Sequence, residues 1–425
     1  MTPPPDGAPL DTPLPRVTTT SSPALARALG ALYARVPLGM RLGLEAMRAA
    51  CIRAGNPENA YAVAHVAGTN GKGSTCAMIE AMARAAGKKT GLYTSPHLAK
   101  FAERIRIDGV PLTDEALAEV LERALEIGPD LSFFETATLA AFLAFRDHGV
   151  DLAVIEVGIG GRLDATNVVA SPRVAAVTRV AFDHMDRLGN TLEAIAREKA
   201  AIAKNGIPIV LGPMAPEVRA AALDVALGAG ALPIVMGDDP DALPRDTVVA
   251  LGGAYQHDNA RIAWRIAREL GIPEAARREG LALASWPGRF EEIVVAKGKL
   301  GGTWLFDGAH NPDGARALVS ALEATPPGAI VFGALADKAW REMLDILKEL
   351  PSPRFYVAPQ GRAAAAPSDL AAHTPGLVST SLPLALTKAH RVAGKSAVLV
   401  CGSLYLVGEA RALLLGEPMD PPVAL

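Results

Sequence analysis

Residues 65–74 read His65-Val66-Ala67-Gly68-Thr69-Asn70-Gly71-Lys72-Gly73-Ser74, and this stretch decides the fold. The apolar run 60–64 leads into it, and CAMIEAMARAAG (76–87) follows with the composition of a helix. A strand that ends in a glycine-rich turn and opens a helix presents free backbone N–H groups and the positive end of the helix dipole to one point. Lys72 can reach the outer phosphates of a nucleotide there, and the hydroxyl of Ser74 or Thr75 can meet a magnesium ion. The stretch predicts a phosphate-binding loop, although Gly73 separates the lysine from the hydroxyl, which departs from the usual spacing.

Strand-like and helix-like segments alternate on both sides of this loop. Helices are expected over 23–35 and 41–55, a strand at 90–93, an alternating segment at 104–107, and helices from 114 and through 135–146. Further short apolar strands are expected at 151–158, 173–180 and 206–212, with a helix over 192–204. Such alternation predicts a doubly wound, mostly parallel sheet that gathers ligands at the carboxyl ends of its strands.

The alternation of strands and helices is interrupted near Ser285-Trp286-Pro287-Gly288-Arg289 and continues after it. Segments 304–310, 328–334, 353–358 and 396–402 have the composition of buried strands, and helical segments separate them. We therefore predict a flexible tail over 1–20, a nucleotide-binding domain over 21–286 and a smaller α/β domain over 287–425.

The composition restricts the possible partners. The 425 residues carry a formal charge of −3, which provides no broad basic field for nucleic acid or an anionic membrane. Cys51, Cys76 and Cys401 lack metal-ligand spacing and are expected to be packing residues in a reducing compartment. No apolar run is long enough to span a bilayer, and the N-terminus has no signal pattern. We expect a soluble, cytoplasmic protein that acts on small molecules.

Polar residues stand where the predicted strands end. Glu156 interrupts an apolar strand, and a buried carboxylate costs several kcal/mol unless a cation accompanies it. That cation is either a magnesium ion that also contacts phosphate oxygens or the guanidinium of Arg162 or Arg179. His184 follows the strand 173–180, where it is either a metal ligand or an ordinary loop histidine.

The second domain has a similar corner between a strand and a helix, Asp307-Gly308-Ala309-His310-Asn311-Pro312. These residue types suit ligand contacts, but Asp and Asn are also common turn and cap residues. Arg289, at the domain junction, either clamps a phosphate or holds the hinge. Ser95, His97 and Lys199 are weak signals when each is taken alone.

The ordered set of motifs is more specific than any one of them. HVAGTNGKGS, YTSPHL, FFETATLAAF, EVGIGGRLDATN, DHMDRLG with AREKAAI, PGRFE and FDGAHNP occur in this order between about Leu42 and Glu409. This set resembles the folylpolyglutamate synthase/dihydrofolate synthase family of the Mur ligase superfamily. The resemblance implies an α/β protein with a P-loop-type central ATPase domain, a mostly parallel sheet and a smaller Rossmann-like C-terminal domain. It implies ATP and Mg²⁺ as cofactors and ATP-dependent amide formation between a pterin-linked carboxylate and the amine of L-glutamate.

The resemblance also assigns roles to individual positions. The implied catalytic residues are Lys72, Glu156, His184 and Lys199. The implied nucleotide contacts are Thr69, Asn70, Gly71, Lys72, Gly73, Ser74, Asn259, Arg289 and Asp307. Ser74, Ser95, Glu156, His184 and Lys199 are expected around magnesium, and Lys199 matches a position that is carbamylated in relatives. The pterin substrate is expected near Phe133, Phe134, Glu135, Leu163, Asp164 and Ala165, and L-glutamate near His310 and Ser403.

The expected function is therefore a bifunctional ligase that joins L-glutamate to dihydropteroate and to folates through an acyl phosphate. A UDP-muramoyl peptide ligase of the same superfamily is the first alternative; the extra Gly73 and the lack of an N-terminal nucleotide-sugar domain argue against it. A P-loop ATPase that performs no ligation is the second alternative, but such a protein would not need the complete second domain. We expect a monomer.

Overall fold

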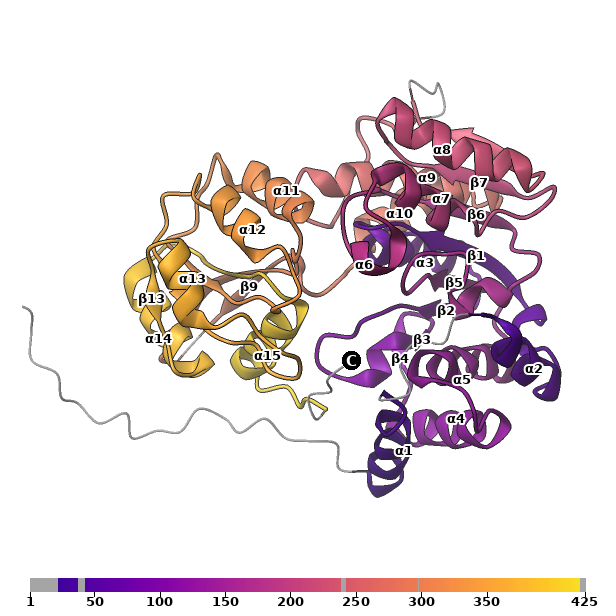
Figure 1. The fold of residues 1–425 in the computed structure, drawn as a ribbon, viewed down its shortest axis with the longest axis horizontal. Coiled ribbons are helices and arrows are strands. Elements are labelled where there is room, and N and C mark those ends of the chain that lie inside the picture. Colours follow the sequence, from indigo (N-terminus) through magenta and orange to yellow (C-terminus); the bar gives the residue numbers. More distant parts are fainter. Residues whose placement is uncertain (1–21, 37–42, 238–241, 297, 421–425) are drawn as a thin grey trace, which may run out of the picture.

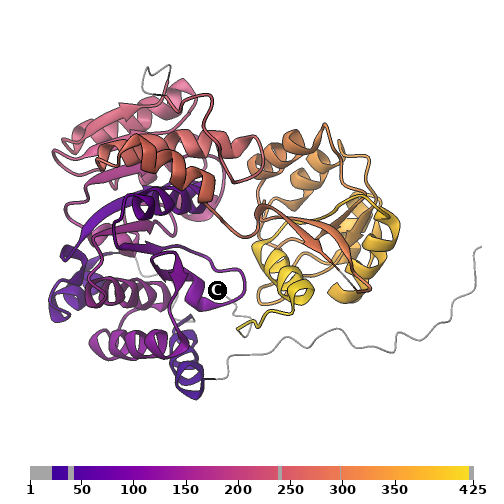
Figure 2. The same cartoon turned by 180° about the vertical axis from the view of Figure 1, so that it is seen from behind.

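The computed structural model describes residues 22–36, 43–237, 242–296 and 298–420. The tail predicted over 1–20 lies outside these residues. Two α/β domains lie side by side, the first drawn in indigo to pink and the second in orange to yellow (Figures 1 and 2). Their cores form around two separate sheets.

The first sheet has eight strands in the order β4-β3-β2-β5-β1-β6-β7-β8. Strands β2, β5, β1, β6, β7 and β8 are parallel, whereas β3 and β4 join antiparallel at one edge. The strands span Ala62–Ala67 (β1), Thr90–Tyr93 (β2), Ile105–Ile107 (β3), Val110–Pro111 (β4), Leu152–Glu156 (β5), Val174–Val177 (β6), Pro208–Leu211 (β7) and Leu232–Val235 (β8).

Helices cover both faces of this sheet, as the alternation along the strands requires. Val63 and Ile155 point into a core with α1, α2, α4 and α5, while Ala64 and Val154 point the other way, toward α3, α9 and α10. Helices α7 and α8 pack beside the first of these groups, over β6 and β7. The helices span Pro23–Tyr33 (α1), Glu45–Arg53 (α2), Lys72–Ala85 (α3), Asp114–Ile127 (α4), Phe133–Asp147 (α5), Met185–Leu188 (α6), Leu192–Ala200 (α7), Pro216–Gly228 (α8), Tyr255–Glu269 (α9) and Glu274–Leu283 (α10). Short 3₁₀ helices occupy Pro57–Asn59 (η2), Phe101–Arg104 (η3) and Ala165–Val168 (η4).

The second sheet has six strands in the order β13-β12-β11-β14-β10-β9, and only β9 is antiparallel. Its strands are Arg289–Val295 (β9), Gly302–Asp307 (β10), Ala329–Phe332 (β11), Arg354–Tyr356 (β12), Leu377–Val378 (β13) and Val398–Cys401 (β14). Its helices are Pro312–Leu322 (α11), Trp340–Leu347 (α12), Pro367–His373 (α13), Leu382–Ala393 (α14) and Leu404–Leu415 (α15).

The predicted fold class is confirmed. The sequence did not reveal β4, β8, β9 or β13, which are the four edge strands of the two sheets and each pair on one side only. The expected helix over 41–55 is described only from Glu45 to Arg53. The three cysteines are buried and free, as expected. No helix in the described ranges is long and apolar enough to cross a membrane.

Candidate active site

The phosphate loop lies between β1 and α3, as predicted. Gly71 is the N-cap of α3 and adopts a left-handed conformation with φ of 85°, which a side chain would strain. A Cβ atom at Gly71 would also lie 2.2 Å from Oδ1 of Asn259 in α9. Glycine is required here because the backbone turns sharply and another helix approaches it closely. The turn leaves the first N–H groups of α3 facing a cavity of about 1280 Å³.

Every site residue predicted from the sequence lines this one cavity. They are Thr69, Asn70, Gly71, Lys72, Gly73, Ser74, Ser95, Phe133, Phe134, Glu135, Glu156, Leu163, Asp164, Ala165, His184, Lys199, Asn259, Arg289, Asp307, His310 and Ser403. They come from both domains and from positions more than 300 residues apart. The fold thus brings the whole predicted set together, while the role of each residue stays a prediction.

Glu156 ends β5 beneath the phosphate loop and is buried. Its Oε1 lies 3.9 Å from Nζ of Lys72, and its Oε2 accepts a hydrogen bond of 3.0 Å from the backbone N–H of Ser95. Burial raises the pKa of Glu156, and Lys72 and the Ser95 N–H partly offset that rise. The arginine alternatives were wrong, because Arg162 pairs with Glu198 and Arg179 pairs with Asp313. The side-chain cation nearest to Glu156 is therefore the lysine of the phosphate loop.

Lys199 is on α7 but points inward, with only 3 % of its surface exposed. Its Nζ donates a hydrogen bond of 3.0 Å to the carbonyl of Gly68 in the phosphate loop. Burial, aided by repulsion from Lys72, lowers the pKa of Lys199 to about 7. Lys199 is therefore a buried amine that is substantially neutral near pH 7, although its sequence signal was weak when taken alone.

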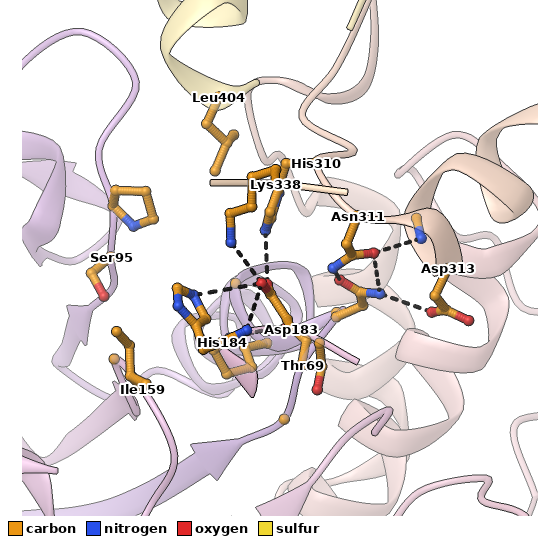
Figure 3. Close-up of a pocket in the computed structure, with 18 of the residues that line it drawn as sticks. Thr69, Ser95, Ile159, Asp183, His184, His310, Asn311, Asp313, Lys338 and Leu404 are labelled. Atoms are coloured by element: carbon orange, nitrogen blue, oxygen red, sulfur yellow. Dashed lines mark hydrogen bonds and ion pairs between the residues drawn. The ribbon is translucent and has the colours of Figure 1, made fainter. Parts of the chain in front are cut away.

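A charged cluster in the cavity joins the two domains (Figure 3). Lys338 of the second domain donates to Oδ1 of Asp183 at 2.6 Å, and Nε2 of His310 lies 3.5 Å from Oδ2. Burial alone would raise the pKa of Asp183, but the hydrogen bond from His310 and the neighbouring positive charges hold it well below its usual range. His184 has a left-handed φ of 50°, and burial lowers its pKa to about 4, so its imidazole is neutral at pH 7 and can bind a metal ion.

A second contact between the domains reaches the phosphate loop itself (Figure 3). The side-chain amides of Asn70 and Asn311 exchange hydrogen bonds of 3.2 and 2.9 Å, and Asn70 also donates to Asp313 at 2.8 Å. Oδ1 of Asn311 in addition caps α11 by accepting from the N–H of Gly314. The start of α11 therefore contacts the loop that is expected to hold the nucleotide phosphates.

The predicted pterin region lies deeper in the first domain. Phe133 begins α5, and Phe134 lies beside Tyr93, with ring centroids 6.1 Å apart. Glu135 lines the cavity, but its carboxylate accepts from the N–H and the hydroxyl of Ser132 in a capping box. Asp164 accepts backbone hydrogen bonds from Gly158 and Ile159. Aromatic rings next to a fixed carboxylate suit a flat, hydrogen-bonding ring.

The remaining nucleotide candidates lie at the junction of the two domains. Asn259 donates to Gln256, whose amide in turn donates to Oγ of Ser74 at 3.2 Å. The carboxylate of Asp307 accepts a hydrogen bond of 2.6 Å from the hydroxyl of Tyr255. Arg289 donates a hydrogen bond of 3.3 Å to the carbonyl of Gly308. Arg289 therefore contacts the strand-to-helix corner of its own domain and still lines the cavity.

Sequence reasoning missed several residues of the site. Lys338, Asp313, Arg104 and Tyr255 line the cavity, but none was singled out. Lys338 lies in the loop between β11 and α12, six residues after the strand ends, and loops that follow strands supplied the other site residues. Among the described residues no group of three or more His, Cys, Asp or Glu side chains is arranged to hold a metal ion. The predicted donors are instead of mixed type: a serine, a glutamate, a histidine and a lysine.

The two-domain fold, the phosphate loop and the cavity between the domains define an ATP-dependent ligase of the Mur type. Residues 66–209 match the Mur ligase middle domain, and residues 288–404 match the Mur ligase glutamate ligase domain.

Comparison with individual proteins shows to which family of Mur-type ligases the chain belongs. The chain is 33 % identical to dihydrofolate synthase/folylpolyglutamate synthase of Bacillus subtilis, over 90 % of this chain and 97 % of the relative. It is 36 % identical to the dihydrofolate synthase/folylpolyglutamate synthase of Escherichia coli, over 88 % of this chain and 91 % of the relative. The structure of E. coli FolC in complex with DHPP and ADP superimposes with a TM-score of 0.83 at 33 % identity, covering 94 % of this chain and 99 % of that one. The chain therefore belongs to the folylpolyglutamate synthase/dihydrofolate synthase family of ATP-dependent glutamate ligases.

Proposed function

We propose that this enzyme joins L-glutamate to dihydropteroate, which yields dihydrofolate, and also to folates, which extends their glutamate chain. The observation that carries the proposal is the single cavity that contains the phosphate loop, an aromatic pocket and a facing wall from the second domain. The bifunctional names of the B. subtilis and E. coli relatives support both acceptors, and a related structure contains AMPPNP, Mn and L-glutamate. A cytoplasmic, monomeric enzyme stays a prediction.

The residues present fit a nucleotide with its magnesium ion. Gly71 leaves room for a close anion, and Lys72 and the first turn of α3 face the same space. Glu156, the hydroxyls of Ser74 and Ser95, and the neutral imidazole of His184 would hold the metal ion. When bound, magnesium neutralises the charge of the phosphates during phosphoryl transfer.

The reaction proceeds in two steps. An oxygen of the acceptor carboxylate attacks the γ-phosphorus of ATP, the bond from that phosphorus to the ADP oxygen breaks, and an acyl phosphate and ADP result. The amine of L-glutamate then attacks the acyl carbon, inorganic phosphate leaves, and the amide nitrogen loses a proton. Lys72 stabilises the negative charge that spreads over the transferred phosphoryl group.

Lys199 has the properties that a carbamate requires. Only a neutral amine attacks CO₂, and burial makes the neutral form accessible near pH 7. The nitrogen would form a bond to carbon and release one proton, leaving an anionic oxygen that points into the cavity. We infer that this oxygen serves as a further metal ligand.

The second domain closes the site against water. His310, Ser403 and Lys338 face the first domain across the cavity, where they can contact L-glutamate. An acyl phosphate hydrolyses in water, so the amine must meet it in an enclosed space. Contacts from Asn311 to Asn70 and from Lys338 to Asp183 hold the two walls together.

ADP release by the purified protein tests this proposal. ATP, magnesium and L-glutamate are supplied with dihydropteroate, with tetrahydrofolate or without an acceptor. We expect turnover with either acceptor only when glutamate is present. Turnover with one acceptor would assign the narrower activity. Release that depends on neither glutamate nor acceptor would support an ATPase without ligase activity.

A further inference from the structure

Arg104 is a buried cation in the cavity that none of the assigned roles uses. It ends η3 directly before β3, and only 2 % of its surface is exposed. Its carbonyl accepts a hydrogen bond of 3.0 Å from the N–H of Thr94, so it lies next to Ser95, which Figure 3 labels at the cavity wall. It lines the cavity together with Phe133, Glu156 and Tyr405. Its guanidinium therefore lies within the first domain but faces the space where substrates are expected.

The surroundings of Arg104 hold it in place without neutralising its charge. Its Nε donates to Nδ1 of His97 at 2.8 Å, and a ring nitrogen that accepts a hydrogen bond carries no proton, so this partner is an uncharged imidazole. The guanidinium carbon lies 5.3 and 5.4 Å from the ring centroids of Phe101 and Phe133. Rings and a neutral imidazole orient a guanidinium but do not supply a negative charge.

The carboxylates nearby are engaged by other groups. Glu103 accepts from the backbone N–H groups of Leu98, Ala99 and Lys100, and Asp420 accepts from that of Phe101. Glu156 accepts from Ser95 and faces Lys72. Within the described part of the chain no carboxylate lies within 4.0 Å of the Arg104 guanidinium and neither Nη nitrogen has a hydrogen-bond partner, although Glu156 attracts the guanidinium from a longer distance.

A buried guanidinium with no carboxylate within 4.0 Å costs several kcal/mol, and a bound anion would offset that cost. Burial lowers the pKa of Arg104, but arginine remains charged at physiological pH. The two Nη groups form a fork that matches a carboxylate. The Phe133 ring lies 5.4 Å from the guanidinium carbon, and Phe134, Ser95, Glu156 and Lys72 line the same cavity. An acceptor whose ring packs against these phenylalanines could place its carboxylate at the Arg104 guanidinium, in the same cavity as Lys72.

We propose that Arg104 binds the benzoate carboxylate of dihydropteroate and positions it for attack on the γ-phosphoryl group. This inference rests on the proposed function, because it presumes that acceptor. The guanidinium contributes charge and direction, while the phenylalanines contribute ring contacts that do not depend on charge. Arg104 therefore distinguishes an acceptor that carries a carboxylate from one of the same shape that does not.

Equilibrium binding of dihydropteroate and of its uncharged carboxamide, without ATP, tests the proposal. We expect the wild-type enzyme to prefer the carboxylate by at least about tenfold, the scale of one charge-assisted contact. Arg104→Gln should lose that preference while binding the carboxamide within about twofold of wild type, and Arg104→Lys should retain part of it. Arg277→Gln is the matched control, because Arg277 also lies over an aromatic ring, Trp264 at 4.2 Å, but outside the cavity.

Two results would overturn the inference. One is a wild-type enzyme that binds the carboxamide as tightly as dihydropteroate, which can be measured even if no variant folds. The other is an Arg104→Gln enzyme that keeps the wild-type preference. In both cases ligation by the wild-type enzyme would still support the proposed function. A wild-type enzyme that binds neither ligand and does not ligate would contradict the proposed function itself.

Discussion

The two walls of the cavity differ in what holds their functional groups. On the first domain Lys72, Glu156 and Lys199 take their contacts from the same domain and lie at or beneath the phosphate loop. On the second domain Lys338 and Asn311 make their contacts with residues of the first domain. The first wall is therefore preorganised by its own fold, whereas the second is completed only when the domains meet. We expect changes in the first wall to affect the chemical step most and changes in the second to affect closure.

Lys72→Ala should have the largest effect. Its ammonium is the charge that the loop presents to the phosphates, and a lost preorganised contact of this kind costs at least about 3 kcal/mol in the transition state, roughly a hundredfold in rate. Steady-state ligation measures the loss, with Lys89→Ala, an exposed lysine of the same domain, as the control. Wild-type turnover in Lys72→Ala would rule out the phosphate assignment.

Lys199→Ala should reduce ligation by about tenfold or more, and short carboxylic acids should partly restore it if a carbamate is the ligand. The wild-type enzyme provides a second test. Because the pKa of Lys199 is about 7, the amine is protonated below that pH and cannot react with CO₂, whereas it is neutral above. At equal concentrations of dissolved CO₂, activity that was lost on removal of CO₂ should therefore recover faster at pH 8 than at pH 6. Full activity of Lys199→Ala would remove this residue from the site.

Lys338→Ala should have an intermediate effect. It breaks the ion pair between the domains and leaves Asp183 without its closest cation, which we expect to lower kcat/KM for L-glutamate by about tenfold. Lys348→Ala is the matched control. Lys348, directly after α12, forms an exposed ion pair with Asp345 in that helix, within the same domain. If both variants lost the same activity, the pair between the domains would have no special role.

Asn311→Ser should have the smallest effect. Serine can still cap α11, so the variant removes the amide contact to Asn70 and keeps the helix start. The variant loses the two amide hydrogen bonds exchanged with Asn70, but Asn70 keeps its bond to Asp313. We therefore expect a net loss of about 1 kcal/mol, the worth of one neutral hydrogen bond, which raises the KM for ATP roughly fivefold with little change in thermal stability. A variant that loses stability but keeps its KM would show that Asn311 acts only as a cap.

The sequence was most informative where chemistry depends on local order. The run from His65 to Ser74 needs only a strand, a glycine turn and a helix to present its N–H groups, and those are short-range properties. Glu156 was identifiable because a carboxylate within an apolar strand is anomalous. The edge strands were missed because their residues are half exposed and show no strong period.

What the sequence determined by itself was the alternation of strands and helices, the phosphate loop and the family, since each follows from residue order. Only the tertiary structure decided which cation meets Glu156, that Lys199 is buried against Gly68, and that Arg104 is buried with no carboxylate of the described residues within 4.0 Å. It also decided that Lys338 meets Asp183 across 155 positions of chain. Burial and long-range pairing depend on how the elements pack, and packing sets the pKa of a side chain and the partner that it finds.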